Sequence, residues 1–224
     1  MFRHGSRRRA HLLRPLILIA LTAGALTAGA SVTAASEGAA AVAADCATAE
    51  APYAAYASKV PVTAQDLRNA EHAVLYLVNA ERAKFGLGAL CWDDQIGGAA
   101  RAHAENWRGE DRACPSSPNW FGCSHWDSRP GYAWPPDRVA KSGYGPCSNY
   151  CVGENTYHGW GVSGGTYYGT PQAAVSWWMN HDGGKNKHRD AILKADWIHA
   201  GTGAATYRDT SRYGAAYVLN FGKR

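Results

Sequence analysis

Three polar side chains in the second half of the chain, His125, Glu154 and His188, have the types that acid–base or metal chemistry requires. Imidazole and carboxylate groups transfer protons near neutral pH, and both bind divalent cations. The three residues are 29 and 34 positions apart, so no local motif joins them. The fold has to bring them together, and spacing alone does not establish that it does.

A fourth candidate is Ser163, at the centre of a Gly-Val-Ser-Gly-Gly run that matches the pattern of a nucleophilic serine. That pattern is meaningful where a buried strand leads into it and a helix leads out. The flanking residues are rich in glycine and aromatic side chains and fit neither element. A flexible loop is therefore the favoured interpretation of Ser163.

Helices are the elements that the sequence predicts most clearly. Thr63 and Asp66 form the pattern of a capping box, and apolar side chains then recur at helical spacing. Thr170 before Pro171 is the pattern of a helix start with proline in the first turn. The expected helices span about 64–85, 94–109 and 171–180, with a short helical turn over 137–141.

Strand patterns are concentrated near the C-terminus. Residues 199–207 and 214–221 predict a terminal hairpin. Residues 90–92 are interpreted as a short connector, and the glycine- and tyrosine-rich residues 143–170 as loops around short strands. Helices flanking an antiparallel sheet give an α+β fold, and no internal repeat or second domain is apparent.

The charge of the chain is concentrated in its first 44 residues. The 224 residues carry 23 Lys plus Arg and 18 Asp plus Glu, a net charge of +5. Five arginines and one glutamate lie in residues 1–44, which leaves 18 basic and 17 acidic residues, or +1, for the remainder. A nearly neutral domain gives no electrostatic reason to expect a nucleic-acid partner.

The same N-terminal stretch has the pattern of an export signal. An arginine-rich start is followed by an apolar run over residues 16–30 and by small residues before Asp45. We expect a cleaved signal peptide over 1–44, with a twin-arginine signal at Ser6–Arg8 as an alternative route. The apolar run is short for a membrane span, so no transmembrane anchor is expected after cleavage. The predicted location is extracellular, and residues 45–63 form an Ala- and Pro-rich extension before a domain over 64–224.

All six cysteines follow the expected cleavage site, which favours disulfides in an oxidising compartment. Sequence alone leaves many pairings open. Short loops favour pairing Cys114 with Cys123 and Cys147 with Cys151, which leaves Cys46 for Cys91. The last bridge would attach the N-terminal extension to the domain.

The order of short motifs along the chain resembles the CAP superfamily of cysteine-rich secretory proteins, antigen 5 and pathogenesis-related class one proteins, in its bacterial SCP-like form. No single motif is specific, but their order is, and together they cover about 64–222. The matching stretches are Val78–Arg82, Leu90–Asp93, Ala100–Ala104, Ser124–His125, Val152–Asn155, Ala174–Val175, Trp178–Asn180, His188–Leu193, His199–Gly203 and Tyr217–Gly222.

The resemblance implies a three-layer α-β-α sandwich with an antiparallel central sheet, a large cavity, and loop insertions stapled by disulfides. In that family two histidines and two glutamates line the cavity, and some members bind zinc or another divalent cation there. His125, Glu154 and His188 match three of the four positions, so His125 and His188 are candidate metal ligands. The second glutamate is missing, and His181 stands near its place. A mechanism that needs a second carboxylate is therefore in doubt.

The favoured function, implied by the resemblance, is a secreted, non-catalytic module that binds a lipid or sterol-like ligand or a cell-surface protein or glycan. One alternative is a metal-dependent hydrolase, a protease or cell-wall enzyme, that uses His125, Glu154 and His188, although the chain lacks an HExxH motif. Another is a disulfide-stapled adhesion or structural surface protein that uses the aromatic loop over 109–136. Packing of that loop against its disulfides is the favoured explanation of its aromatic residues, and the oligomeric state stays open.

Overall fold

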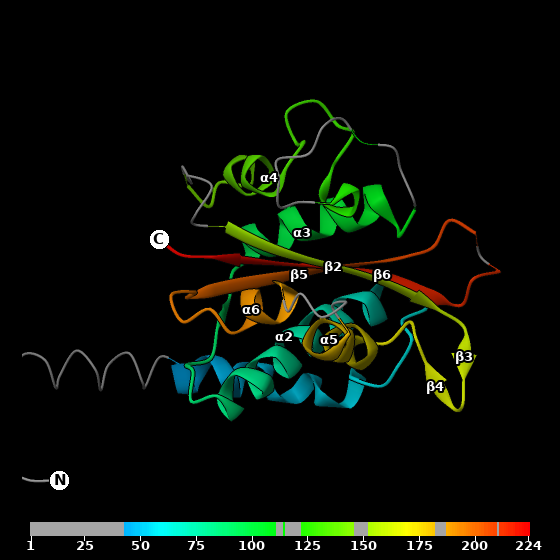
Figure 1. Ribbon diagram of the computed structural model, residues 1–224, viewed down its shortest axis with the longest axis horizontal. Helices are drawn as coiled ribbons and strands as arrows, with labels where there is room; N and C mark the ends of the chain where they lie inside the picture. Colours follow the sequence, from blue (N-terminus) through cyan, green and yellow to red (C-terminus); the bar gives the residue numbers. More distant parts are fainter. Residues whose placement is uncertain (1–42, 111–113, 115–121, 146–151, 182–186, 210) are drawn as a thin grey trace, which may run out of the picture.

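The computed structural model describes residues 43–110, 114, 122–145, 152–181, 187–209 and 211–224. One sheet lies between two layers of helices (Figure 1). The upper layer in that view holds α3 (Asp94–Trp107) and α4 (Pro135–Lys141), and the lower layer holds α2 (Ala64–Lys84), α5 (Pro171–Asn180) and α6 (Lys187–Ile192). The expected three-layer α-β-α sandwich is confirmed.

The central sheet has the strand order β1-β5-β6-β2. The expected terminal hairpin forms its middle, since β5 (His199–Thr206) pairs antiparallel with β6 (Gly214–Gly222). β6 also pairs antiparallel with β2 (Val152–Trp160), whereas β1 (Cys91–Trp92) runs parallel to β5. The prediction of an antiparallel sheet is therefore wrong, and the sheet is mixed. A strand of two residues carries no alternating pattern, so no local signal separated β1 from a connector.

β2 is a second difference from expectation, because residues 143–170 were expected to hold only short strands. It has nine residues, most of them buried. Strands covered on both faces lose the alternation of apolar and polar residues that identifies half-exposed strands. Gly159 allows the carbonyl oxygen of Tyr168 to approach the strand, and a side chain there would collide with that oxygen. β2 is thus built from residues that resemble a loop.

The helices begin where their caps predict. The Thr63 side chain accepts the backbone N–H of Asp66, and the Asp66 carboxylate accepts the backbone N–H of Thr63. The Thr170 hydroxyl accepts the backbone N–H of Ala173 at the start of α5. The short helix predicted over 137–141 begins two residues earlier, at Pro135.

Adjacent tryptophans on α5 face different environments. Trp178 is fully buried in the largest apolar core, and its Nε1–H donates to the carbonyl oxygen of Thr156 at 2.9 Å. Trp177 is half-buried and lines pockets on the surface of the protein. One face of α5 therefore holds the core, and the neighbouring face is available to a ligand.

Two of the favoured disulfides are present. Cys114 is joined to Cys123, as the short loop between them predicts, and Cys46 is joined to Cys91, the pair that this choice leaves. Cys147 and Cys151 lie outside the described residues, so their pairing stays a prediction. Residues 1–42 of the expected signal peptide also lie outside the described residues, so the signal peptide stays a prediction.

The N-terminal extension packs onto the domain. Residues 43–50 are helical and are followed by the 3-10 helix η1 (Ala51–Tyr56). The His72 ring of α2 stacks between Tyr53 and Trp92, with ring centroids 4.4 and 4.1 Å apart. Its Nδ1 lies 2.9 Å from a carboxylate oxygen of Glu50. The Cys46–Cys91 bridge therefore reinforces an interface that is already packed and polar.

The lengths and compositions of the helices also bear on membrane association. Within the described ranges, none is both long and apolar enough to span a bilayer.

Candidate functional site

Glu154 lies at the centre of a buried polar cluster between the sheet and α4. β2 contributes Glu154, α4 contributes Arg138, and the 3-10 helix η2 (Cys123–His125) contributes His125. Arg138 Nη2 lies 2.7 Å from both carboxylate oxygens of Glu154, and His125 Nδ1 lies 3.0 Å from Oε1. The Glu154 side chain is fully buried. The fold thus joins two of the residues that the sequence singled out.

These contacts keep the Glu154 carboxyl ionised. Burial alone would raise its pKa, but the positive charge of Arg138, assisted by His103 and His125, lowers the pKa to about 2. A carboxylate with such a low pKa is a weak base at neutral pH. The cluster is therefore better suited to holding elements together than to transferring protons.

A second ion pair lies beside the first. Asp127 is buried and is bound by Arg129 and by Asn106 Nδ2, the latter at 2.7 Å. His103 of α3 connects the two groups, because its Nδ1 is 3.3 Å from Asp127 and its Nε2 is 4.0 Å from Glu154. Burial opposes the charge on Asp127, but the hydrogen bonds from His103 and Arg129 bring the pKa of its carboxyl well below the usual range.

The donor set around Glu154 does not fit a divalent metal. Both carboxylate oxygens contact the Arg138 guanidinium, so a cation bound to them would lie against a positive charge. Across the ranges that the structure describes, no three or more His, Cys, Asp or Glu side chains are placed to hold a metal ion. Zinc binding through His125 and His188 stays a prediction, and no step below depends on a metal.

His188 and His181 both lie near Trp177. His188, on α6, has its ring centroid 5.1 Å from that of Trp177, and its carbonyl oxygen accepts Asn155 Nδ2–H at 3.0 Å. His181 is the C-cap residue of α5 and lines a pocket with Trp177. No contact that the structure gives among its described residues joins either imidazole to Glu154. The contacts described thus pair His125 with Glu154 and place His188 and His181 beside Trp177.

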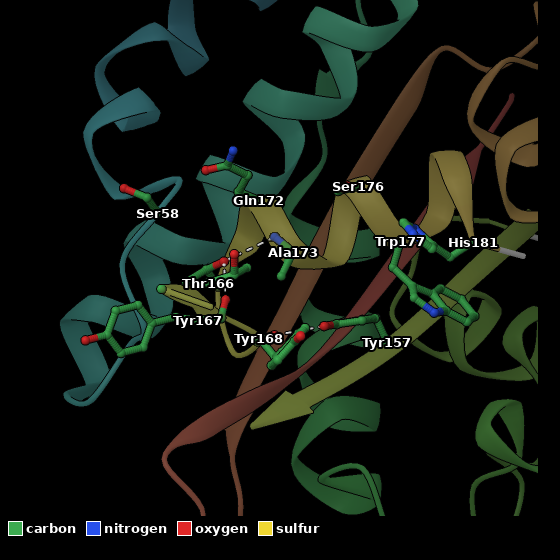
Figure 2. A pocket seen from close by; sticks show the side chains of 12 residues that line it. Ser58, Tyr157, Thr166, Tyr167, Tyr168, Gln172, Ala173, Ser176, Trp177 and His181 are labelled. Atoms are coloured by element: carbon green, nitrogen blue, oxygen red, sulfur yellow. Dashed lines mark hydrogen bonds between the residues drawn. The ribbon is translucent and has the colours of Figure 1, made fainter. Parts of the chain in front are cut away.

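Two pockets meet at Tyr157 and Trp177, whose ring centroids are 6.0 Å apart. The smaller has a volume of about 380 Å³ and lies beside β2, where Ser124, Thr156 and His188 line it. The larger, which we call the aromatic groove, has a volume of about 590 Å³. Its main lining residues are Tyr157, Tyr167, Tyr168, Gln172, Ser176 and Trp177 (Figure 2).

The remaining sequence candidate, Ser163, lies in the exposed hairpin of β3 (Val162–Ser163) and β4 (Thr166–Tyr167). No helix follows β3 directly, so the context of a nucleophilic serine is absent from this described segment. The segment was interpreted as a flexible loop, and the structure shows a small hairpin instead.

Sequence reasoning missed Arg138 and Asp127, which determine the state of the polar cluster, and it missed the aromatic groove. Arg138 lies in the short helix α4 and Asp127 in a loop, and neither has a local pattern that marks it as buried. The groove combines residues from three separate segments, most of which were expected to be loops. Exposed aromatic residues after β2 were the available signal.

Comparison with known proteins agrees with the order of motifs. A family model described as CAP, the cysteine-rich secretory protein family, matches residues 75–221. The uncharacterized protein YkwD of Bacillus subtilis is 30% identical over 157 residues, which cover 66% of this chain and 51% of that protein. The chain thus spans about half the length of this curated relative.

Two solved structures are also similar. An extracellular protein containing an SCP domain from Bacillus anthracis has 21% identity and a TM-score of 0.48, with 73% of this chain and 45% of that chain covered. An outer surface protein from Borrelia burgdorferi has 21% identity and a TM-score of 0.46, with 67% of this chain and 90% of that chain covered. Because the family model spans 147 of the 224 residues, the chain belongs to the CAP, or cysteine-rich secretory protein, family.

Proposed function

We propose that the chain is an exported, non-catalytic binding module whose ligand is held beside Trp177. The observation that carries this proposal is the state of Glu154. Its carboxylate is buried, paired with Arg138 on both oxygens and further bound by His125. A group so fully engaged has no free oxygen to accept a proton from a substrate.

Export is supported by the N-terminal pattern and by the disulfides. The basic, apolar and small-residue order of residues 1–44 is that of a signal peptide. The Cys46–Cys91 and Cys114–Cys123 bridges are typical of an oxidising compartment. Both observations support an extracellular location.

The two pockets that meet at Trp177 support the place of binding. Concave sites with aromatic walls and a few polar groups are typical of ligand sites. The half-buried Trp177 and the buried Tyr157 contribute to both pockets, so a ligand longer than either pocket can pass across them. A lipid or sterol-like molecule and a cell-surface protein or glycan are the ligand classes that the family resemblance favours.

A hydrolase is the second candidate, and one contact favours it. His125 Nδ1 lies 3.0 Å from Glu154 Oε1, the arrangement by which a carboxylate orients a histidine base. In this alternative His125, Glu154 and His188 would act together, with a bound metal. The Arg138 ion pair weighs against it, because it lowers the basicity of Glu154.

Two measurements on the oxidised protein purified from culture medium without chelator test the proposal. Mass spectrometry under native and denaturing conditions is expected to detect a bound ligand, and hydrolysis assays on casein and purified peptidoglycan are expected to show no turnover. Turnover that is lost in His125→Ala would contradict the proposal and establish the hydrolase. Metal analysis of the same sample tests the zinc prediction separately, with a His125→Ala/His188→Ala variant as its control.

A further inference from the structure

The aromatic groove combines the β3–β4 hairpin and the helix α5 that follows it with Tyr157 of β2 and with the distant N-terminal extension. The β3–β4 hairpin contributes Tyr167 and Tyr168, α5 contributes Gln172, Ser176 and Trp177, and Ser58 follows η1 of the N-terminal extension. Figure 2 shows the side chains of α5 on one side and the tyrosines on the other. The groove is open to solvent, since Tyr167 and Tyr168 are 47% and 42% exposed.

The lining combines aromatic rings with uncharged polar groups. Ser58, Thr166, Gln172 and Ser176 supply hydroxyl and amide groups between the tyrosine and tryptophan rings. Among its described lining residues there is no Lys, Arg, Asp or Glu. An uncharged lining gives no preference for an ionic ligand.

The aromatic surface continues beyond the groove. Tyr213, 50% exposed, lies against Tyr167 with ring centroids 6.3 Å apart. A shallow hollow of about 310 Å³ joins these two rings to Lys59 and Asp66, whose opposite charges balance. Of the large apolar side chains that are exposed in the described residues, most lie at this end of the molecule: Trp160, Val162, Tyr167, Tyr168 and Tyr213. A gathering of exposed aromatics on one face is typical of a binding surface.

Hydrogen bonds fix the walls of the groove before any ligand binds. Tyr157 Oη donates to the carbonyl oxygen of Tyr168 at 2.9 Å, and burial raises the pKa of Tyr157 to about 12, so this donor stays protonated. The backbone N–H of Gln172 donates to the carbonyl oxygen of Ala57 at 2.8 Å, which attaches the extension to α5. Rigid aromatic side chains on a fixed backbone lose little conformational entropy on binding.

These features match the chemistry of a neutral sugar chain. A pyranose ring presents C–H bonds that pack on aromatic faces and hydroxyls at its edge that pair with amide and hydroxyl groups. An open groove leaves the outer hydroxyls in water, where they are satisfied, whereas an acyl chain would leave apolar surface exposed there. We propose that the aromatic groove binds a neutral oligosaccharide of pyranose units, with Tyr168 and Trp177 as stacking surfaces. The inference rests on the proposed binding function and names its ligand class and site.

Isothermal titration of the oxidised protein with cellotetraose and with tetra-N-acetylchitotetraose tests this inference. One of the two sugars is expected to bind with a dissociation constant below about 1 mM. Tyr168→Ala is expected to weaken binding about tenfold or more, Tyr168→Phe to retain it within about threefold, and Gln172→Ala to weaken it by an intermediate factor. Phe85→Ala is the matched control, because Phe85 is similarly exposed at the end of α2 and lies outside the groove.

The alternative results are distinct. If neither sugar binds while a fluorescent fatty acid does, and Tyr168→Ala abolishes that binding, the sugar inference is overturned and the proposed binding function stands. If Tyr168→Ala and Phe85→Ala weaken sugar binding equally, the assignment to the groove is overturned. Cleavage of the tetrasaccharide during the titration would overturn the proposed non-catalytic function as well.

Discussion

The Glu154 cluster and the aromatic groove lie on different sides of the sheet and use polar groups in opposite ways. In the cluster, buried charges face one another, and Glu154 and Asp127 are each bound by an arginine and further donors. In the groove, uncharged polar groups lie among half-exposed rings. The first arrangement holds secondary-structure elements together, and the second presents groups that a ligand can use.

Side chains capable of acid–base chemistry can therefore serve to hold elements of a fold together. Arg138 connects α4 to β2 through Glu154 and also donates to carbonyl oxygens of the preceding loop. Buried ion pairs of this kind cost much more to break than to replace with apolar groups. The comparison therefore predicts large stability effects in the cluster and small ones in the groove.

The largest effect is expected from Arg138→Met. It leaves Glu154 buried without a counter-charge and should lower the free energy of unfolding by about 3–5 kcal/mol, measured by urea denaturation with tryptophan fluorescence. Lys223→Met, which removes a surface partner of Asp196, is the control and should change the free energy of unfolding by about 0.5 kcal/mol or less. Arg138→Met/Glu154→Gln should recover part of the loss. A loss below about 1 kcal/mol in the single variant would show that the buried pair does not stabilise the fold.

Removing the Cys46–Cys91 bridge should lower the free energy of unfolding by about 2–4 kcal/mol, measured by thermal denaturation. Removing the Cys114–Cys123 bridge should lower it by less. The first bridge closes a separation of 45 residues and the second closes one of 9. Cys46→Ser/Cys91→Ser should also weaken ligand binding, because the extension carries Ser58 to the groove wall. Unchanged binding in this variant would mean that the extension plays no part in the groove.

Acid should destabilise the protein through Glu154. Its pKa is lowered from an ordinary 4.5 to about 2 in the folded state, so its contribution is complete above about pH 4.5 and is lost as the pH falls towards 2. The free energy of unfolding should fall by about 3 kcal/mol over this pH range, which denaturation experiments at a series of pH values measure. Asp127 adds a change of the same sign. Glu154→Gln should flatten the curve in this window, and an unchanged slope would contradict the lowered pKa.

The smallest stability effect is expected in the groove. Gln172→Ala removes an exposed side chain and leaves the backbone hydrogen bond to Ala57, so the free energy of unfolding should change by about 0.5 kcal/mol or less. Urea denaturation alongside Arg138→Met measures both regions under one condition. A cost similar to that of Arg138→Met would remove the contrast between the two regions.

Much of the scaffold was predictable because its signals are local. The Thr63 and Thr170 caps fix the starts of α2 and α5. The Cys114–Cys123 disulfide follows from its short loop, and Cys46–Cys91 is the pair that remains once the short loops are closed. The His125–Glu154 pair came from the family resemblance, since no local pattern joins residues 29 positions apart.

Other parts were not predictable because they depend on contacts made only after folding. β2 is covered on both faces and lacks the alternating pattern of a half-exposed strand. Arg138 stabilises the fold through its ion pair with Glu154, which lies 16 residues away in sequence. The groove exists only when the hairpin, α5 and the extension are assembled.

The most direct test of the account is a two-dimensional NMR titration of the oxidised protein with the tetrasaccharide that binds more tightly. We predict that the amide signals of Tyr168 and Gln172 and the indole signal of Trp177 shift in proportion to occupancy, while the signals of His125, Arg138 and Glu154 stay in place. Shifts centred on His125 and Glu154, with the groove signals unchanged, would contradict it.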